Sequence, residues 1–403
     1  EEMGEIQGAG KAMILRKITL PLVLPAILSA VILTFSKAIG TFGTINYLGS
    51  PVQYYTLSSQ LYMNINSRDT QTGFAMAILM IIIASIAVFV NQKLIGSRKS
   101  YATIGGKGGR STLIGLGKVG RPVITAALFV FFAVGIIMPI VILVMESFML
   151  KEGIYSLDNF TLHYWIGESN PQIMEGLPGI FKNDEFINSL FNSLRLTLVN
   201  GVFGTIFGQL LGYITAKGRG RLHGKLVEQL VFIPYLIPSV AFGGIYLSMF
   251  SQPQQIFGVT LVPALYGTFA LLTLVSVVKH LPFAARAGTS NMLQISGELE
   301  EAATIEGAGF FRRFVKIVFP LSKGGFISGF MLIFVSIMKE LDLIILIMTP
   351  TTSTLPYLAF RYQNGNSPQA SDCVAIVMFS IVFLVYAIAN LSGKADLAKS
   401  MAG

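Results

Sequence analysis

The chain has 403 residues, of which 53% are hydrophobic and only 12% are charged, and its mean hydropathy is +0.67. Soluble domains typically carry about 25% charged residues, so this composition excludes an ordinary soluble domain. The net charge is +9, but the bases lie in short stretches between apolar runs, which is typical of membrane topology rather than of nucleic-acid binding. The single cysteine, Cys373, excludes a disulfide framework.

The apolar runs predict eight membrane spans, because about 20 apolar residues can cross a bilayer as a helix. A helix satisfies its own backbone hydrogen bonds in lipid, so we expect an all-α polytopic membrane protein. The predicted spans are 20–40, 73–91, 122–146, 188–215, 227–251, 261–279, 319–347 and 372–392.

The segments between these spans alternate in charge. Segments 92–121 and 216–226 hold bases and no acids, whereas 147–187 carries six acids against two lysines. Segment 280–318 holds four glutamates beside the bases Arg286, Arg312, Arg313 and Lys316. Because bases are enriched on the cytoplasmic side of membranes, we expect 92–121, 216–226 and 280–318 and both ends of this chain in the cytoplasm. Segment 93–121 is rich in glycine and bases, which predicts a flexible linker, and its GGKGGRST lacks the spacing of a phosphate-binding loop.

One polar segment occurs twice. A shift of 299 residues aligns EEMGEIQGAGKAMILRKITLP at 1–21 with EEAATIEGAGFFRRFVKIVFP at 300–320 without a gap, and a predicted span follows each copy. We interpret residues 1–92 as the C-terminal part of one repeat and 122–403 as a complete second repeat with six spans. We expect both copies on the cytoplasmic side of the membrane, so the two repeats would have the same orientation. We therefore expect about 180 further residues, with four spans, upstream of this sequence.

The second copy begins with a short helical pattern at 298–309, because glutamate, leucine and alanine favour a helix and Gly307 and Gly309 end it. The segment is too short and too polar to span a membrane. It is either a docking element for a partner or an amphipathic helix lying on the headgroups. We expect Gly307 to need a backbone conformation that a side chain would spoil.

Charged residues at membrane depth are candidates for a translocation pathway. Lys339, Glu340 and Asp342 lie late in the span 319–347, and they either face a pathway or snorkel to the outer interface. Arg195, near the start of another span, either lines the pathway or anchors its helix at the interface.

Pro234 and Pro238 interrupt the predicted span 227–251, and such breaks mark either a pathway or a packing kink. The three histidines are expected in three separate loops, and no pair has metal-ligand spacing. No arrangement of nucleophile, base or paired carboxylates indicates catalysis. The sequence therefore predicts no metal site, no cofactor and no catalytic residue.

The repeated segment resembles the signature loop of permease subunits of binding-protein-dependent ABC importers. That loop reads E-A-A, three residues, G, nine residues, I-x-L-P, and the second copy has Phe319 in place of the leucine. The first copy has Met3 and Gly4 where the two alanines belong. The matching residues are Glu301, Ala302, Ala303, Gly307, Ile317 and Pro320 in the second copy, and Glu2, Gly8, Ile18, Leu20 and Pro21 in the first.

The resemblance implies a type I ABC importer permease fold in the plasma membrane of a bacterium. It implies that the loop docks a dimer of cytoplasmic ATP-binding subunits, and that an extracytoplasmic binding protein delivers the substrate. ATP hydrolysis then belongs to the partner, so this chain is not itself an enzyme. The implied docking residues are Glu301, Ala302, Ala303, Gly307, Glu2 and Gly8.

A double-length permease with two such loops is most similar to the iron(III) permeases, so we expect iron(III) uptake. Thiamine and 2-aminoethylphosphonate permeases are closely similar and remain alternatives. An alternative of another class is a secondary transporter driven by an ion gradient, which would also contain internal repeats.

Overall fold

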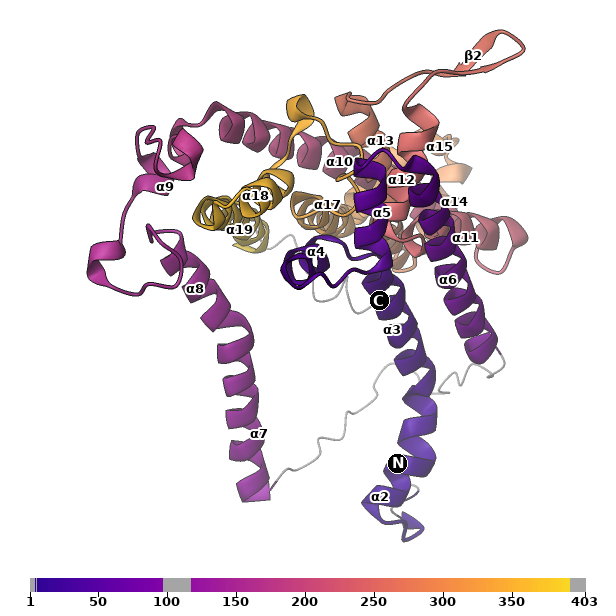
Figure 1. Ribbon diagram of the computed structural model, residues 1–403. Coiled ribbons are helices and arrows are strands. Elements are labelled where there is room, and N and C mark those ends of the chain that lie inside the picture. Colours follow the sequence, from indigo (N-terminus) through magenta and orange to yellow (C-terminus); the bar gives the residue numbers. More distant parts are fainter. Residues whose placement is uncertain (1–3, 5, 97–116, 392–403) are drawn as a thin grey trace.

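The computed structural model describes residues 4, 6–96 and 117–391, and its elements are nearly all helices (Figure 1). We call 4–96 the first unit and 117–391 the second unit. Most of the predicted linker, residues 97–116, lies outside the described residues. The elements of the first unit are α2 (Lys11–Ile14), the π-helix η1 (Leu15–Thr19), α3 (Leu20–Gly40), α4 (Gly43–Gly49), the 3-10 helix η2 (Ser50–Val52), α5 (Leu57–Asn66) and α6 (Thr70–Gly96).

The second unit opens with a long apolar helical rod and a polar segment of short turns. These elements are α7 (Gly117–Phe132), η3 (Ala133–Ile137), α8 (Met138–Glu146), η4 (Leu157–Asn159), α9 (His163–Ile166), η5 (Met174–Gly176) and η6 (Ile180–Lys182). The middle of the unit contains α10 (Asp184–Lys217), α11 (Leu222–Leu236), α12 (Ser239–Phe250), β1 (Gln254–Ile256), β2 (Val259–Val262) and α13 (Phe269–Met292). The remaining elements are α14 (Gly297–Ile305), α15 (Phe310–Arg313), η7 (Phe314–Val318), α16 (Phe319–Leu321), α17 (Lys323–Met338), η8 (Pro350–Thr352), α18 (Leu355–Asn364) and α19 (Pro368–Leu391).

The internal repeat of the sequence is also a repeat of structure. A shift of 299 residues carries α2 onto α15 and η1 onto η7, and it carries α3 onto α16 and α17 together. Under the same shift α5 and α6 begin within one residue of α18 and α19. Both copies therefore place a π-helix at the entry of a long helix, followed by a short helix and a second long helix.

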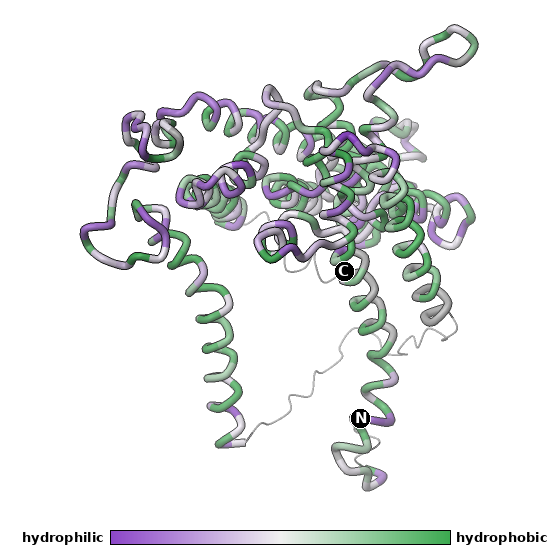
Figure 2. The backbone as a smooth tube through the Cα atoms, in the orientation of Figure 1, coloured by the Kyte–Doolittle hydropathy of each residue, from purple (hydrophilic) through white to green (hydrophobic). Residues whose placement is uncertain are grey.

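Five helices of the described part are long and apolar enough to cross a membrane, and two bent pairs, α11–α12 and α15–α17, would raise the number to seven. The predicted span 20–40 coincides with α3, a helix of 21 residues. Figure 2 shows hydrophobic residues following one another along α3 and α7. The prediction of a helical polytopic membrane protein is therefore confirmed, with the antiparallel hairpin β1–β2 as an exception to an all-α chain.

The predicted interruption of the span 227–251 is confirmed, because α11 and α12 lie at 98° to each other with Pro238 between them. Two other predicted boundaries are wrong. The predicted span 319–347 stops being helical at Met338. The predicted span 261–279 begins inside β2, whereas α13 runs from Phe269 to Met292. The predicted start of the span 261–279 is too early because most residues of β2 are apolar. Its predicted end is too early because the polar residues of α13 beyond 279, among them the buried His280, were assigned to a loop.

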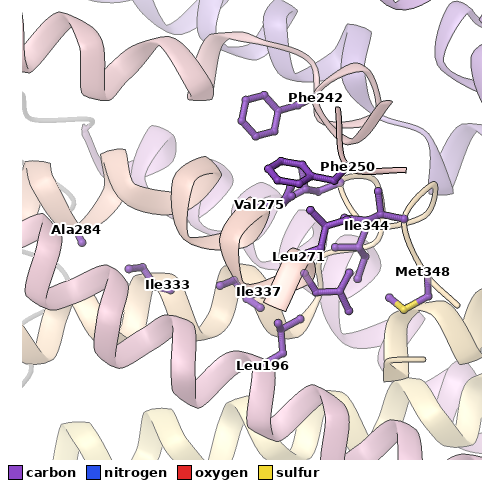
Figure 3. Close-up of a cluster of buried hydrophobic side chains, with 13 residues drawn as sticks. Leu196, Phe242, Phe250, Leu271, Val275, Ala284, Ile333, Ile337, Ile344 and Met348 are labelled. Carbon is purple, nitrogen blue, oxygen red and sulfur yellow. The ribbon is translucent and has the colours of Figure 1, made fainter. Parts of the chain in front are cut away.

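The core of the second unit is the packing of α10 on α13. An added Cβ on Gly208 would lie 2.3 Å from the Cβ of Ala284, and one on Gly212 would lie 2.6 Å from the carbonyl carbon of Gly288. Small residues at these crossings let two backbones approach closely, which is how helices associate in membranes. Buried apolar side chains extend this core toward the outer end, among them Leu196, Leu271, Val275, Ile333 and Ile337 (Figure 3).

The rod formed by α7, η3 and α8 has its α7 end apart from the other helices (Figure 1), while α8 contacts α19, and none of its most apolar window is buried. A helix that exposes apolar side chains all round is suited to lipid rather than water. Among the candidate spans of the described residues, this rod has the smallest buried share.

We expect Gly212→Ala to destabilise the protein, because the new methyl group would enter the backbone of α13. Overpacking of this kind costs about 1–3 kcal/mol. The matched control is Gly324→Ala in α17, where an added Cβ meets nothing within 4 Å and helix propensity improves by about 1 kcal/mol. The midpoint of thermal unfolding in detergent checks this, and equal midpoints for the two variants would contradict the close packing of α10 and α13.

Candidate translocation cavity and docking loop

A cavity of about 1420 Å³ lies between the two units. Its wall combines α3 and α4 of the first unit with the α11–α12 break, α13, α17, α18 and α19 of the second. The wall is largely apolar, and its charged residues come from both units. They are Lys37, Lys279, His280, Lys339, Glu340, Asp342 and Asp372.

The break between α11 and α12 is held by a buried lysine. Lys279 of α13 is 7% exposed, and its Nζ donates hydrogen bonds to the carbonyl of Pro234, at 2.9 Å, and to that of Ile237. The chain bends here because Pro238 has no backbone N–H to continue the helix. Carbonyls freed at membrane depth need a donor, since no water supplies one. Lys279 supplies it, and its Nζ also lies 5.3 Å from the ring centroid of Phe242.

The first unit meets this break at Gly40, the last residue of α3. An added Cβ on Gly40 would lie 2.9 Å from the Cα of Pro238. A residue with a side chain would therefore push α3 away from the break. Pro238 itself lines the cavity, whereas Pro234 contributes its carbonyl to Lys279.

The two units also touch at equivalent positions of the repeat. The backbone N–H of Gly43 donates to Oδ1 of Asp342 at 2.9 Å, and these residues are 299 positions apart. A residue that contacts its own equivalent lies next to the axis relating the two copies. Asp342 therefore marks the pseudo-symmetry axis, and it also caps the first turn of α4.

Glu340 is engaged by a buried histidine. Nδ1 of His280 lies 2.9 Å from the carbonyl oxygen of Ser276. A carbonyl only accepts, so Nδ1 carries a proton. Nε2 lies 3.4 Å from Oε2 of Glu340, and Oε1 of Glu340 accepts from the N–H of Leu343 at 2.9 Å. Oε1 is thus held by a backbone N–H, and Oε2 forms an ion pair with the ring when Nε2 carries a proton as well. The expected loop position of His280 is wrong, because this residue is 3% exposed within α13.

The structure brings four of the six candidate pathway residues together and leaves Arg195 and Pro234 outside the cavity wall. Lys339, Glu340, Asp342 and Pro238 all line the cavity. Arg195 does not line it, and its guanidinium lies 4.1 Å from the ring centroid of Phe269 on α13. Their roles in transport stay predictions.

Sequence reasoning missed several charged groups in the cavity wall. Lys37 lies inside the predicted span 20–40, Lys279 ends the predicted span 261–279, and Asp372 begins the last one. The usable signal was the presence of a charge within an apolar run, which by itself indicates a functional position. The pairing of His280 with Glu340 had no such signal.

The predicted docking helix exists as α14. The hydroxyl of its cap residue, Ser296, accepts from the N–H of Glu298 at 3.3 Å. The helix ends at Gly307, whose φ is +78°, and the N–H of Ala308 donates to Ala303 at 2.9 Å. This is the closing hydrogen bond of a glycine-ended helix. The expectation that Gly307 needs a special backbone conformation is confirmed.

The first copy of the loop repeats this ending. Gly8 has φ +80°, and the N–H of Ala9 donates to the carbonyl of Gly4 at 2.9 Å, which is the same bond under the shift of 299. Glu2 lies outside the described residues. The left-handed glycine is therefore common to both copies, although the two alanines are not.

The docking loop is attached to α10 through Glu300. Its Oε2 accepts from the hydroxyl of Tyr213 at 2.6 Å, and its Oε1 lies 2.6 Å from Nζ of Lys217. Burial by itself raises the pKa of Glu300. Hydrogen bonds from Lys217 and Tyr213, with the charges of Lys217 and Arg313, outweigh burial and hold this pKa below its ordinary value.

The opposite face of the docking loop is open. Glu301, Ala302 and Gly307 are exposed and Ala303 is half-buried. Ile305 is 85% exposed and Leu299 48% exposed. A short helix that is anchored by one buried glutamate and presents apolar and small residues outward has the form of a protein-binding surface.

We expect Lys279→Met to destabilise the protein, because it leaves two carbonyls at the break without a donor. Each unsatisfied group costs about 1–3 kcal/mol. Lys37→Met is the matched control, since Lys37 lines the same cavity and forms no hydrogen bond to the break. Thermal unfolding in detergent checks this, and a Lys279 variant as stable as the control would show that the lysine does not hold the break.

We expect Glu300→Gln to loosen the docking loop at a cost of about 1 kcal/mol, because its partner Lys217 is partly exposed. Glu298→Gln, at an exposed position of the same helix, is the control. A carboxylate with a lowered pKa stabilises the folded state above its unfolded pKa. The difference from wild type should persist down to about pH 4 and shrink below it. Proteolysis of the loop as a function of pH measures this, and a difference that grows as the pH falls would refute it.

A family model described as the binding-protein-dependent transport system inner membrane component matches residues 1–101 and 204–395. The ferric transport system permease protein FbpB of Actinobacillus pleuropneumoniae is 22% identical over 411 residues, which cover 100% of this chain and 56% of the relative. The sulfate transport system permease protein CysT of Synechocystis sp. is 26% identical over 212 residues, which cover 50% of this chain and 71% of the relative.

Among solved structures, a bacterial ABC transporter involved in the import of the acidic polysaccharide alginate matches with a TM-score of 0.53 at 16% identity. The match covers 67% of this chain and 94% of that one, and it shows a common fold. This chain spans about half the length of the ferric-transport relatives that it matches. Because the family model covers well over half of the residues, the chain belongs to the family of inner-membrane components of binding-protein-dependent transport systems.

Proposed function

We propose that this chain is the permease subunit of an ABC importer and forms the substrate pathway between its two units. The observation that carries the proposal is the repeated docking loop, ended in both copies by a left-handed glycine, next to units that enclose a cavity. A dimer of cytoplasmic ATP-binding subunits would bind the two loops and move them as it closes on ATP. The chain would hydrolyse nothing itself.

In this proposal residues 1–92 are the C-terminal part of the first permease half, 93–121 are a cytoplasmic linker, and 122–403 are the second half. The docking residues are those of the two loops, with Glu301, Ala302, Ala303 and Gly307 in the second copy and Glu2 and Gly8 in the first. The exposure of the second loop supports this role, because a surface open to water is available to a partner. The chain would lie in the plasma membrane of a bacterium with both of its ends in the cytoplasm.

Iron(III) is the substrate that we propose first. Two relatives that align with 100% and 93% of the chain are named ferric transport system permease proteins. An extracytoplasmic binding protein would deliver the substrate, as the family description implies. Thiamine and 2-aminoethylphosphonate remain alternatives.

The test uses the full-length chain with its ATPase and its binding protein in liposomes. ATP hydrolysis is recorded with iron(III), thiamine and 2-aminoethylphosphonate offered in turn. Stimulation by iron(III) alone supports iron(III) as the substrate. Stimulation by another compound instead supports the permease function and rejects iron(III) as the substrate. An ATPase that does not bind the chain at all would refute the docking role of the loops.

We expect Gly307→Val to uncouple ATP hydrolysis from uptake, because valine disfavours a positive φ by about 1–2 kcal/mol and the loop would end differently. Gly309→Val is the matched control. Gly309 has φ −68°, and an added Cβ meets nothing within 4 Å at either glycine, so the two sites differ in backbone conformation rather than in space. Uptake per ATP hydrolysed is the measurement, and similar values for the two variants would contradict the role of Gly307.

A further inference from the structure

The cavity wall contains two lysines without an acidic partner. Lys37 comes from α3 of the first unit and Lys339 follows α17 of the second, and both are exposed to the cavity. Neither takes part in the ion pairs formed among the described residues. Nζ of Lys37 lies 5.8 Å from the ring centroid of Tyr235.

Two of the three acids in the cavity wall accept hydrogen bonds from other groups of the protein. Oε1 of Glu340 accepts from the N–H of Leu343, and its Oε2 faces Nε2 of His280. Oδ1 of Asp342 accepts from the N–H of Gly43. Asp372 is the exception, since it forms no hydrogen bond with the described residues. It interacts electrostatically with Glu146, the last residue of α8, and with Glu152, which follows this helix.

Lys37 and Lys339 are therefore the lysines of the wall that no described carbonyl or acid binds, and each unit contributes one. Lys279 is already bound to two carbonyls, and it interacts electrostatically with Glu340 as well as with Lys37. Unpaired ammonium groups inside a membrane protein are unfavourable, and a negatively charged group between them relieves the cost. The rest of the wall is apolar, so an anion would be held by few groups and could leave again.

We infer that the cavity takes a negatively charged cargo, either an oxyanion or a metal ion carried in an anionic chelate, and that Lys37 and Lys339 hold it between the two units. The inference rests on the proposed transport function and names the charge of its substrate. It accommodates iron(III) as an anionic complex, and it disfavours a cation such as thiamine. Because the lysines come from different units, a change in the distance between the units would change how firmly the anion is held.

The test compares uptake and ATP hydrolysis in the same liposomes, with the full-length chain, its ATPase and its loaded binding protein at saturation. The probes are ferric citrate, sulfate and thiamine. The test variant is Lys37→Gln with Lys339→Gln, and a second variant carries arginine at both positions to restore the charge. Lys323→Gln, at an exposed lysine outside the cavity, is the matched control.

We expect wild type to take up ferric citrate or sulfate, and the double glutamine variant to lose about tenfold in uptake per ATP. The double glutamine variant should keep its stimulated ATP hydrolysis within about twofold of wild type. Lys323→Gln should keep both uptake and hydrolysis within that range, and the double arginine variant should recover uptake. A purely structural role of the lysines would reduce hydrolysis and uptake together.

Two results would overturn the inference. One is uptake of thiamine by wild type, and the other is anion uptake that the double glutamine variant leaves unchanged. Failure of the proposed function looks different, because wild type would then show no ATP-dependent uptake of any probe and would not bind the ATPase. That result would overturn both.

Discussion

The arrangement of the two units depends on one requirement, that a carbonyl freed at membrane depth must find a donor. The break between α11 and α12 frees the carbonyls of Pro234 and Ile237, and Lys279 binds both. The break in turn places the buried Pro238 against Gly40 of the first unit, which has no side chain to separate them. The buried lysine thus sets the position of α3, and with it one wall of the cavity.

The two units meet with approximate symmetry but with different chemistry. Gly43 and Asp342 are equivalent positions, and one donates its backbone N–H to the carboxylate of the other. Lys339 and Glu340 correspond to Gly40 and Thr41. The charged side chains at these positions therefore belong to the second unit, whereas the glycine that allows close backbone contact belongs to the first.

Much of the docking loop could be predicted from sequence, because its information is local. The helical pattern at 298–309, its glycine end and its repetition follow from residue types at fixed spacing, and α14 covers Gly297–Ile305 of it. Gly307 has a positive φ, a conformation that a side chain disfavours, as expected. The cavity could not be predicted in the same way. His280 was assigned to a loop because it is polar, yet its partner Glu340 comes from a distant part of the chain. Hydropathy averages report whether a segment suits lipid, and they do not report which polar groups pair inside it.

A continuous path of contacts joins the docking loop to the cavity. Glu300 binds Tyr213 and Lys217 at the end of α10, and α10 packs on α13 with glycine at the crossings. The helix α13 then carries both Lys279, which holds the break, and His280, which holds Glu340. Helices packed backbone to backbone move as one body, because no flexible side chains separate them. A displacement of the docking loop would therefore reach the cavity wall through two packed helices, and it would change the separation of the groups that the two units contribute to that wall.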